Sequence, residues 1–348
     1  MPIPTVDKEA TTVRILVRMP NWLGDAVMAT PALNNLLGHF PQAQFVLVGS
    51  PPVAELFSID PRFHAVVADT SRSHRIRLAG LWKQARQLRA EHGPFASAWT
   101  FQNSMSSRVL LYALRAPRRI ARKRGLADLL LTHPVPCDPR CHHAEIYNTV
   151  VNGSLGTAYP TGATSLWVPQ PQQYPQATAG IHPGAAYGSA KRWEPRKFAE
   201  TALALSGRYQ IVLLAGPKEC ELADEIEGRL RAAGVQHCTN LAGRTSLPEL
   251  VSRIAGLDLL ICNDSGPMHV AGACGVPTVA IFGSTDPACT RPWRHAHFRC
   301  VRRELPCSPC LARVCPLAHH ACMRDIQPQE VVAAAWSLVA SPGVAAAS

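Results

Sequence analysis

Three short segments combine glycine with charged or hydroxyl side chains, and each directly follows a stretch with the pattern of a buried strand. They span residues 21–25 (NWLGD), 182–193 (HPGAAYGSAKRW) and 263–269 (NDSGPMH). Glycine lets backbone amides approach a ligand closely, and polar groups at the carboxyl ends of parallel strands face the usual ligand site of an α/β domain. The three segments are therefore the places where we expect chemistry.

The first segment offers a carboxylate. Gly24 permits a tight turn, and Asp25 falls at the start of the next predicted helix. An Asp at this position commonly caps its helix, and that structural role stays open. The alternative is a general base, because a helix N-terminus stabilises the ionised carboxylate that proton abstraction requires.

The second segment has the composition of a diphosphate site. Gly184 and Gly188 allow backbone N–H groups to approach an anion, Lys191 supplies a point charge, and Arg192 supplies a fork of donors. The spacing differs from that of a P-loop. The two cations nevertheless favour an anionic ligand more strongly than a glycine-rich loop alone would.

The third segment predicts a helix start that can bind an anion. Asp264 or Ser265 is a natural N-cap, and a helix beginning with Ser-Gly presents free N–H groups. His269 lies one turn into this helix and could donate to a ligand, although a lone helical His more often has a packing role. The segment thus complements the diphosphate loop.

The chain contains no Asp-x-Asp pair, which disfavours the metal-chelating motif of many diphosphate-sugar enzymes. The charge of a leaving diphosphate would instead be neutralised by Lys191, Arg192 and the helix N-terminus. We therefore expect group transfer from an activated diphosphate donor, with no metal site and no cofactor.

Two domains must position these segments. The length of 348 residues suggests about two domains, and 47% apolar with 17% charged residues excludes a mainly disordered chain. Strands alternate with helices on both sides of a Pro-rich stretch, which predicts two parallel-sheet α/β halves. The predicted domains are residues 1–165, a linker at 166–178, residues 179–326, and a C-terminal helix and tail at 327–348 that pack back toward the N-terminal domain.

The element boundaries follow from apolar periodicity and from Gly and Pro. The predicted strands are 13–19, 45–48, 65–68, 95–101, 179–182, 209–215, 257–262 and 277–282. The predicted helices are 26–37, 78–91, 106–114, 195–205, 219–232, 247–255, 268–273 and 331–339. The N-terminus has no apolar signal region, and the longest uncharged stretch is broken by Gly and Pro. We therefore expect a cytosolic protein without a membrane span.

The positive charge is concentrated in one segment. The formal net charge is +11, while residues 62–124 alone carry 14 Lys and Arg against two acids, or 14 − 2 = +12. Such a surface is either simply solvated or meets a polyanion. Aromatic residues are only 6% of the chain, so stacking on nucleic-acid bases is poorly supported. Phosphate or carboxylate groups on a lipid or sugar are the favoured partners.

A cysteine cluster lies near the C-terminus. Cys307, Cys310, Cys315 and Cys322 form the pattern C-x2-C-x4-C-x6-C, with two His between the last two thiols. Four thiols can hold tetrahedral zinc, but only one CxxC pair is present. The alternative is a reduced Pro-rich loop, which is common for cysteines in the cytosol.

At its three motifs the sequence resembles the ADP-heptose:lipopolysaccharide heptosyltransferases of glycosyltransferase family 9. The matching stretches are NWLGDAVMATPAL, PGAAYGSAKRW and NDSGPMHVAGACGVPTVAIFG, and their order and separation match too. The resemblance implies an α/β GT-B fold with two Rossmann-like domains facing a central cleft. It also implies inverting, metal-free transfer of L-glycero-D-manno-heptose from ADP-heptose onto the first heptose of the lipopolysaccharide inner core.

The resemblance also implies roles for individual residues and for the membrane. Asp25 matches the proposed catalytic base. The acceptor would be the Kdo/heptose-lipid A core, met at the inner leaflet by a cytoplasmic, peripherally associated enzyme, with no nucleic acid as partner. The donor-binding set is Gly184, Tyr187, Lys191, Arg192, Asp264, Ser265, Gly266 and His269. The acceptor-binding set is Asn21, Trp22, Asn103, Ser104, Arg119, Arg122 and Arg124.

Two other functions remain open from the sequence. One is a GT-B glycosyltransferase with a different nucleotide-sugar donor or acceptor, since adenine recognition cannot be deduced from these motifs. The other is a basic nucleic-acid-binding protein with a zinc loop, which would bind nucleic acid with a steep salt dependence. The order of the three motifs favours transfer chemistry over that second alternative.

Overall fold

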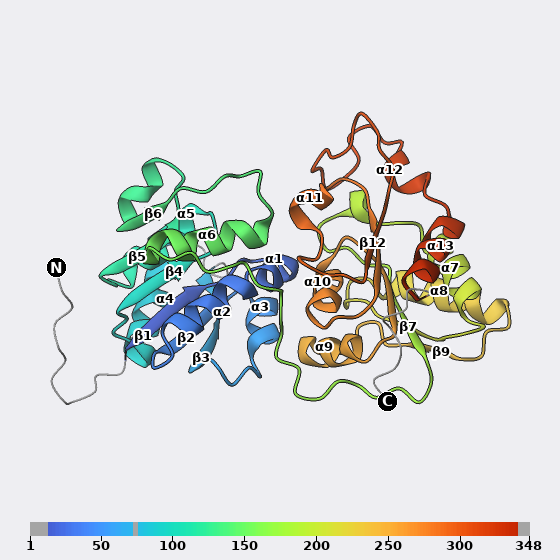
Figure 1. Cartoon of the computed structure of the whole chain (residues 1–348), viewed down its shortest axis with the longest axis horizontal. Helices are drawn as coiled ribbons and strands as arrows, with labels where there is room; N and C mark the ends of the chain where they lie inside the picture. Colours follow the sequence, from blue (N-terminus) through green and yellow to red (C-terminus); the bar gives the residue numbers. More distant parts are fainter. Residues whose placement is uncertain (1–12, 72–75, 340–348) are drawn as a thin grey trace. The chain divides into compact units, whose positions relative to one another are not determined.

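Each half of the chain is built on one parallel six-stranded sheet, as the alternation of elements predicts (Figure 1). The structure is a computed structural model that describes residues 13–71 and 76–339. Residues 72–75 of the basic segment and both chain ends lie outside this description. They include the N-terminal stretch that we expect to lack a signal region. The described helices include none that is long and apolar enough to cross a membrane.

The first sheet runs in the order β3-β2-β1-β4-β5-β6. Its central strand pairs with β2 and β4 through near-continuous apolar runs, with Leu16 opposite both Val46 and Ala98. Such runs are typical of strands covered on both faces. The strands are β1 (Arg14–Arg18), β2 (Gln44–Gly49), β3 (Ala65–Ala68), β4 (Ser97–Thr100), β5 (Arg118–Arg122) and β6 (His133–Val135).

The helical elements of the first half connect these strands in βαβ order. They are α1 (Leu23–Met28), α2 (Thr30–His39), α3 (Pro51–Phe57), α4 (Arg77–His92), α5 (Met105–Ala113), the 3-10 turn η2 (Leu126–Leu130) and α6 (His143–Leu155). The single helix predicted over 26–37 is two helices. Pro31 has no N–H for the carbonyl of Val27, and the hydroxyl of Thr30 donates to that carbonyl at 2.7 Å instead.

The second sheet has the order β12-β11-β10-β7-β8-β9. Its strands are β7 (Thr178–His182), β8 (Gln210–Leu213), β9 (Cys238–Asn240), β10 (Leu259–Asn263), β11 (Thr278–Phe282) and β12 (Phe298–Arg302). Its helical elements are η3 (Ser189–Lys191), α7 (Pro195–Leu205), α8 (Cys220–Ala232), α9 (Leu247–Ala255), α10 (Gly266–Ala273), α11 (Pro287–Thr290), α12 (Ala321–Arg324) and α13 (Pro328–Val339).

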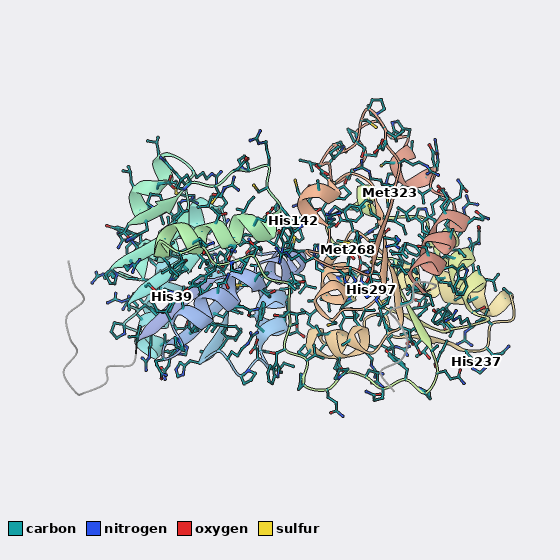
Figure 2. The ribbon with its side chains drawn as sticks, in the orientation of Figure 1. His39, His142, His237, Met268, His297 and Met323 are labelled. Atoms are coloured by element: carbon teal, nitrogen blue, oxygen red, sulfur yellow. The ribbon has the colours of Figure 1, made fainter. Side chains whose placement is uncertain are left out.

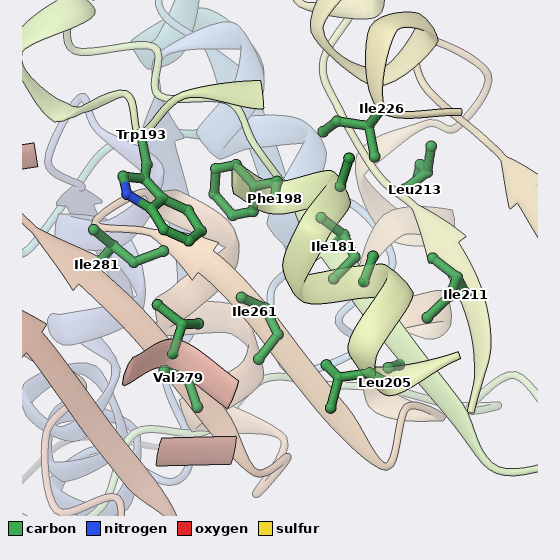
Figure 3. Packing of buried hydrophobic residues seen from close by; sticks show 14 of the residues in the cluster. Ile181, Trp193, Phe198, Leu205, Ile211, Leu213, Ile226, Ile261, Val279 and Ile281 are labelled. Atoms are coloured by element: carbon green, nitrogen blue, oxygen red, sulfur yellow. The ribbon is translucent and has the colours of Figure 1, made fainter. Parts of the chain in front are cut away.

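The core of the second unit lies between this sheet and its helices. Figure 3 shows Phe198 and Leu205 on α7 directed toward strand residues, and the indole of Trp193 near Ile281. The Trp193 indole also donates to the carbonyl of Ile326 at 3.2 Å, so its one polar atom is satisfied inside the core. This core holds the loops that follow β7 and β10 on a rigid base.

The chain divides into two compact units whose bounds differ from the predicted domains. Unit 1 contains residues 1–22, 31–139 and 144–161, and unit 2 contains 23–30, 140–143 and 162–348. The segment 23–30 belongs to unit 2 because α1 packs against α10. The structure therefore interleaves segments that the sequence assigns to one continuous N-terminal domain.

Contacts within unit 2 hold the C-terminal helix and the linker. The C-terminal helix α13 packs against α7, β11 and β12, with Val331, Ala335 and Leu338 in the unit 2 core. Residues 166–177 of the linker form no helix or strand, and this segment runs alongside α9. Gln172 N–H donates to the Ser252 carbonyl at 2.9 Å, which anchors this segment to unit 2.

Candidate active site

The predicted anion-binding segments meet at one edge of the second sheet. β7 and β10 are neighbours, and the sheet's strand order reverses between them. In open parallel sheets, ligands bind outside the carboxyl ends of the strands at such a reversal. The loop after β7 carries residues 183–192, and the loop after β10 leads into α10. The topology thus brings together two motifs that lie about 70 residues apart, as Lys191 and Asp264 do.

Lys191 is held by a buried carboxylate. Its Nζ donates to Asp264 Oδ2 at 2.5 Å, and the two side chains are only 10% and 4% exposed. The hydroxyl of Thr285 donates to the same oxygen of Asp264. The Lys191 ammonium also lies 4.8 Å from the ring centre of Tyr187. The structure therefore fixes Lys191 in place and partly neutralises its charge.

The turn at Gly184 binds a carboxylate of the chain itself. Glu219 Oε1 accepts from the Ala185 N–H at 2.8 Å and from the Arg192 guanidinium at 3.4 Å. A Cβ at Gly184 would lie 2.0 Å from Glu219 Oε2, so glycine is required for the carboxylate to approach. The sequence treats Arg192 and this turn as available to a ligand, whereas the structure already gives both an internal partner.

The cysteine-rich segment covers the outer side of the same loop. The Ala190 N–H donates to the carbonyl of Arg313 at 3.0 Å, and the hydroxyl of Tyr187 donates to the Leu311 carbonyl at 2.7 Å. A Cβ at Gly188 would lie 2.2 Å from that Arg313 carbonyl oxygen. Gly188 is thus needed for close packing of two backbone segments.

The start of α10 has the properties of an anion site. Ser265 is the N-cap residue, and its hydroxyl, which is buried, has no hydrogen-bond partner within the described parts of the chain. Gly266 is the first helical residue, so its amide belongs to the free N-terminal donors. A Cβ at Gly266 would lie 2.7 Å from the side chain of Leu23 in α1. An anion here would satisfy the hydroxyl and the helix end together.

Asp25 lies on α1, which packs directly on α10 (Figure 1). A Cβ at Gly24 would lie 2.5 Å from Cδ2 of His269, so only glycine lets this backbone lie against the imidazole ring. Burial lowers the pKa of His269 to about 4, opposed by the nearby carboxylates of Asp264 and Asp25. His269 is therefore neutral at pH 7, and its Nδ1 has no partner among the described residues.

Asp25 has a histidine partner that the sequence analysis missed. Its Oδ1 lies 2.8 Å from Nδ1 of His143, the first residue of α6, and both side chains are partly exposed. The neighbouring His142, labelled in Figure 2, bonds through Nε2 to the carbonyl of Arg291 at 2.8 Å. An imidazole bound to one oxygen of a carboxylate fixes its orientation, which is what a general base needs.

The predicted acceptor residues lie in unit 1, mostly at the carboxyl edge of its sheet. Asn21 follows β1, and its side-chain oxygen accepts from the amide of Gln102, beyond β4. Asn103 is exposed, and Ser104 caps α5 by accepting from the Ser107 N–H at 3.2 Å. Trp22 is 44% exposed beside this motif. These loops belong to the adjacent strands β1 and β4.

A buried arginine connects the loops after β4 and β5. Arg108 on α5 donates to the Asn103 side chain at 3.2 Å, to the Arg122 carbonyl at 2.7 Å and to Asp128 Oδ1 at 3.2 Å. Asp128 Oδ2 in turn accepts from the Arg124 N–H at 2.7 Å. The Arg108–Asp128 pair was not predicted, and it positions three of the predicted acceptor residues.

Arg119 is the predicted acceptor residue that the structure places elsewhere. It lies near the start of β5, about three residues or roughly 10 Å before the carboxyl edge. Its guanidinium donates to the carbonyls of Leu130 and Ala116, both at 2.8 Å. The Arg119 guanidinium therefore has two internal partners away from the carboxyl edge, while Arg122 and Arg124 lie at the edge.

The four clustered cysteines are all free thiols in the structure. Burial raises the pKa of Cys322, and the neighbouring Cys310, Cys315 and Cys307 raise it further. Throughout residues 13–71 and 76–339, no three His, Cys, Asp or Glu side chains are grouped so that they could hold a metal ion.

His143, Glu219 and Thr285 join the site only through the fold. The pair of His at 142–143 lies where no element was predicted, and the Glu that begins the helix predicted over 219–232 was a weak signal. Thr285 follows the strand next to β10, at the same sheet edge. A search of the residues after every predicted strand would have included Thr285.

Comparisons with known proteins identify the family of this chain. The model of glycosyltransferase family 9 (heptosyltransferase) matches residues 81–321. Lipooligosaccharide heptosyltransferase 2 of Campylobacter jejuni is 33% identical over 94% of this chain and 98% of its own length. Lipopolysaccharide heptosyltransferase 2 of Salmonella typhimurium is 28% identical over 95% and 100%.

A solved structure supports the fold class. The Escherichia coli ADP-heptose lipopolysaccharide heptosyltransferase II has a TM-score of 0.79 and 26% identity, covering 94% of this chain and 98% of that one. The predicted GT-B class, with two parallel-sheet α/β units, is confirmed. The match to a family of enzymes also argues against the nucleic-acid-binding alternative.

Proposed function

Because this chain belongs to glycosyltransferase family 9, the heptosyltransferases, we propose that it is the inverting enzyme that adds the second heptose of the lipopolysaccharide inner core. It is a heptosyltransferase of core biosynthesis, and the proposal specifies its substrates. The donor is ADP-heptose carrying L-glycero-D-manno-heptose. The acceptor is the first heptose of the Kdo/heptose-lipid A core, and the reaction uses no metal.

The packing of α1 on α10 is the observation that carries the proposal. It places Asp25 in the same unit as the Lys191–Asp264 pair, on the helix that lies against His269. A base and an anion site held together by one core suit the transfer of a sugar from a diphosphate. A structural cap alone would not require Gly24 and Gly266 to bring two helix starts so close.

The proposed chemistry is one displacement. Asp25 takes the proton of an acceptor hydroxyl while that oxygen attacks the anomeric carbon of the donor heptose. The bond from this carbon to the β-phosphate oxygen breaks with inversion, and ADP leaves with the bonding electrons. Lys191, Arg192 and the α10 amides stabilise the departing diphosphate, and His143 orients the base.

The bound donor would change the internal pairs. A diphosphate at Lys191 competes with Asp264, which keeps Thr285 as a partner, and Arg192 can exchange Glu219 for phosphate. The unpartnered Ser265 hydroxyl gains an acceptor. Nearby, the neutral His269 can donate one N–H to the donor without adding charge.

The acceptor and the location complete the proposal. Asn21, Trp22, Asn103, Ser104, Arg122 and Arg124 would contact the phosphates and acidic sugars of the core. An acceptor embedded in lipid requires the enzyme to work at the cytoplasmic face of the inner membrane. The basic residues of unit 1 can supply electrostatic attraction, about 1 kcal/mol for each well-placed Lys or Arg.

The test is a transfer assay with purified core acceptor and ADP-, GDP- and UDP-heptose, each with and without EDTA. We expect product only from the ADP donor, in the presence of EDTA, with inverted anomeric configuration by NMR. Transfer from another nucleotide-heptose would keep the enzyme class and change the donor. Loss of activity in EDTA that added metal restores would contradict the metal-free mechanism.

A further inference from the structure

An unusual concentration of exposed apolar side chains lies on unit 1. Of the fifteen large apolar residues that are exposed in the described ranges, seven lie between positions 76 and 129. They are Ile76, Leu78, Trp82, Met105, Tyr112, Leu126 and Leu129. Isolated exposed apolar residues are common, but a contiguous group needs an explanation.

The structure joins these residues into one surface. Trp82 on α4 and Tyr112 on α5 contact edge to face, with ring centres 6.5 Å apart. Met105 and Tyr112 lie seven residues apart on α5 and so share one stripe. At the helix starts, the Arg77 side chain donates to the Ser106 hydroxyl at 2.8 Å, which ties α4 to α5 (Figure 1).

The turn η2 extends the surface past α5. Arg119 lies 5.6 Å from the ring centre of Tyr112 and donates to the carbonyl of Leu130, the last residue of η2. The same turn carries Leu126 and Leu129, which are 90% and 84% exposed. Two leucines so fully in water on a hydrogen-bonded turn make no contribution to the core. We call the seven residues together the α4–α5–η2 surface.

The charges around this surface are predominantly positive. Arg77, Lys83 and Arg86 lie on the exposed side of α4, and Lys83 and Arg86 are within one turn of Trp82. Arg115 and Arg118 follow the end of α5. From residue 76 to 129 the sequence contains two acids, Glu91 and Asp128, and Asp128 is paired with the buried Arg108. A protein partner or a second copy of this chain would have to bring many acids, whereas an anionic bilayer offers both negative headgroups and an apolar interior.

We propose that the α4–α5–η2 surface is the membrane-docking face of the enzyme, and that Trp82, Leu126 and Leu129 insert into the headgroup region of an anionic bilayer. This rests on the proposed function, because a lipid-borne acceptor gives the enzyme a reason to dock. It goes further by adding apolar insertion to electrostatic attraction. Membrane binding by inserted aromatic and aliphatic side chains persists at high salt. Membrane binding by electrostatic contacts to headgroups is weakened by salt.

The test measures flotation of the full chain with vesicles that contain no acceptor, made of phosphatidylglycerol and phosphatidylethanolamine or of phosphatidylcholine alone. Wild type is expected to float with the anionic vesicles and to keep a bound fraction at high salt. Leu126→Ser/Leu129→Ser should reduce partitioning at high salt by about tenfold or more. Lys83→Gln/Arg86→Gln should weaken binding at low salt.

The matched control is Leu203→Ser, which removes an exposed leucine from α7 of unit 2 and should leave flotation unchanged. Turnover on a soluble, delipidated core acceptor separates this proposal from the proposed function, because the leucine variants should retain it. Flotation of the leucine variants equal to wild type would overturn the docking face. Loss of turnover on the soluble acceptor would also overturn it, since the surface would then bind the core sugar itself.

Discussion

The carboxyl edges of the two sheets are built from different kinds of polar contact. In unit 2, carboxylates pair with cations: Asp264 with Lys191, and Glu219 with Arg192. In unit 1, Arg108 donates mainly to backbone carbonyls and a side-chain amide oxygen of the loops that it joins. The first arrangement suits a small, highly charged ligand that exchanges partners with the protein. The second suits a large ligand that needs fixed loops and an exposed surface.

This difference between the two edges predicts a different source of binding energy for each substrate. The buried Lys191–Asp264 pair holds its ammonium in a fixed position, so a donor diphosphate would meet a preorganised cation for which it competes with Asp264. The cations of unit 1 that remain exposed act at longer range and are screened by salt. The affinity for the donor should therefore depend on individual residues. The affinity for the acceptor or the membrane should depend on the combined charge of the exposed cations.

The largest expected effect comes from breaking the unit 2 pair. Lys191→Met leaves the buried Asp264 carboxylate with the Thr285 hydroxyl as its one side-chain hydrogen-bond partner among the described residues. We expect a loss of about 3–5 kcal/mol in unfolding free energy, measured by urea denaturation. ADP affinity, measured by calorimetry, should fall as well.

The double variant Lys191→Met/Asp264→Asn separates these two effects. It removes the unpaired charge, so stability should recover in part, while ADP binding should stay weak. Equal stability of the single variant and wild type would show that the pair is not formed in solution. Recovery of ADP affinity in the double variant would argue against Lys191 as a diphosphate ligand.

A methyl group at Gly24 tests the close contact of α1 with α10. Gly24→Ala places a carbon 2.5 Å from His269, so the ring or the helix must move. We expect about 1–3 kcal/mol of destabilisation and a drop in turnover of up to about a hundredfold. The control is Gly38→Ala on α2, where an added Cβ would have no atom of the described chain within 4 Å. This substitution should stabilise the protein by about 0.5–1 kcal/mol.

The buried His269 predicts how stability depends on pH. Its pKa is about 4 in the folded chain and about 6.5 when unfolded, so the unfolded state binds more protons between these values. Stability from this group is present above pH 6.5 and is lost as pH falls toward 4. Between pH 7 and pH 5 the loss should be about 2 kcal/mol.

Comparison with His269→Gln isolates this contribution, because other histidines titrate in the same range. The wild-type minus variant difference in unfolding free energy should shrink by that amount when denaturation is repeated at pH 5. Asp264, Asp25, His142 and Lys191 all act on the imidazole, so the comparison is made at constant ionic strength. A pH-independent difference would mean that His269 is hydrated rather than buried.

The smallest expected effect comes from changing Arg108, which connects the loops after β4 and β5 in unit 1. Arg108→Lys keeps a cation but cannot reach Asn103, Arg122 and Asp128 together. We expect the acceptor KM to rise about tenfold, equivalent to about 1.4 kcal/mol, with ADP affinity unchanged. Arg86→Lys, an exposed position on α4, serves as the control. A change in ADP affinity would show that Arg108 does not act on the acceptor loops alone.

Sequence patterns predicted the helices and strands better than they predicted which side chains contact one another. α7 and α9 begin and end at the predicted residues, because apolar periodicity and N-terminal Pro or Ser signals agree there. β5 was missed because Arg118, Arg119 and Arg122 hide its two buried residues. Charged strand ends of this kind give no clear alternation.

The site was predictable to the level of motifs. Asp25, Lys191 and Asp264 were identified because glycine and charge cluster after predicted strands. His143, Glu219 and Thr285 lie 118, 34 and 21 residues from their partners Asp25, Ala185 and Asp264, so no local pattern reveals them. The assignment of α1 to unit 2 depends on packing with α10 and could not follow from composition.

The most direct test compares donor binding with sugar transfer in a single Asp25→Asn preparation. The amide keeps the size and the helix start but cannot take a proton. We predict that ADP-heptose binds within a few-fold of wild type by calorimetry, while single-turnover transfer to the core acceptor falls by about a thousandfold. Transfer at the wild-type rate by this folded variant would contradict Asp25 as the base and leave it a structural role in the first turn of α1.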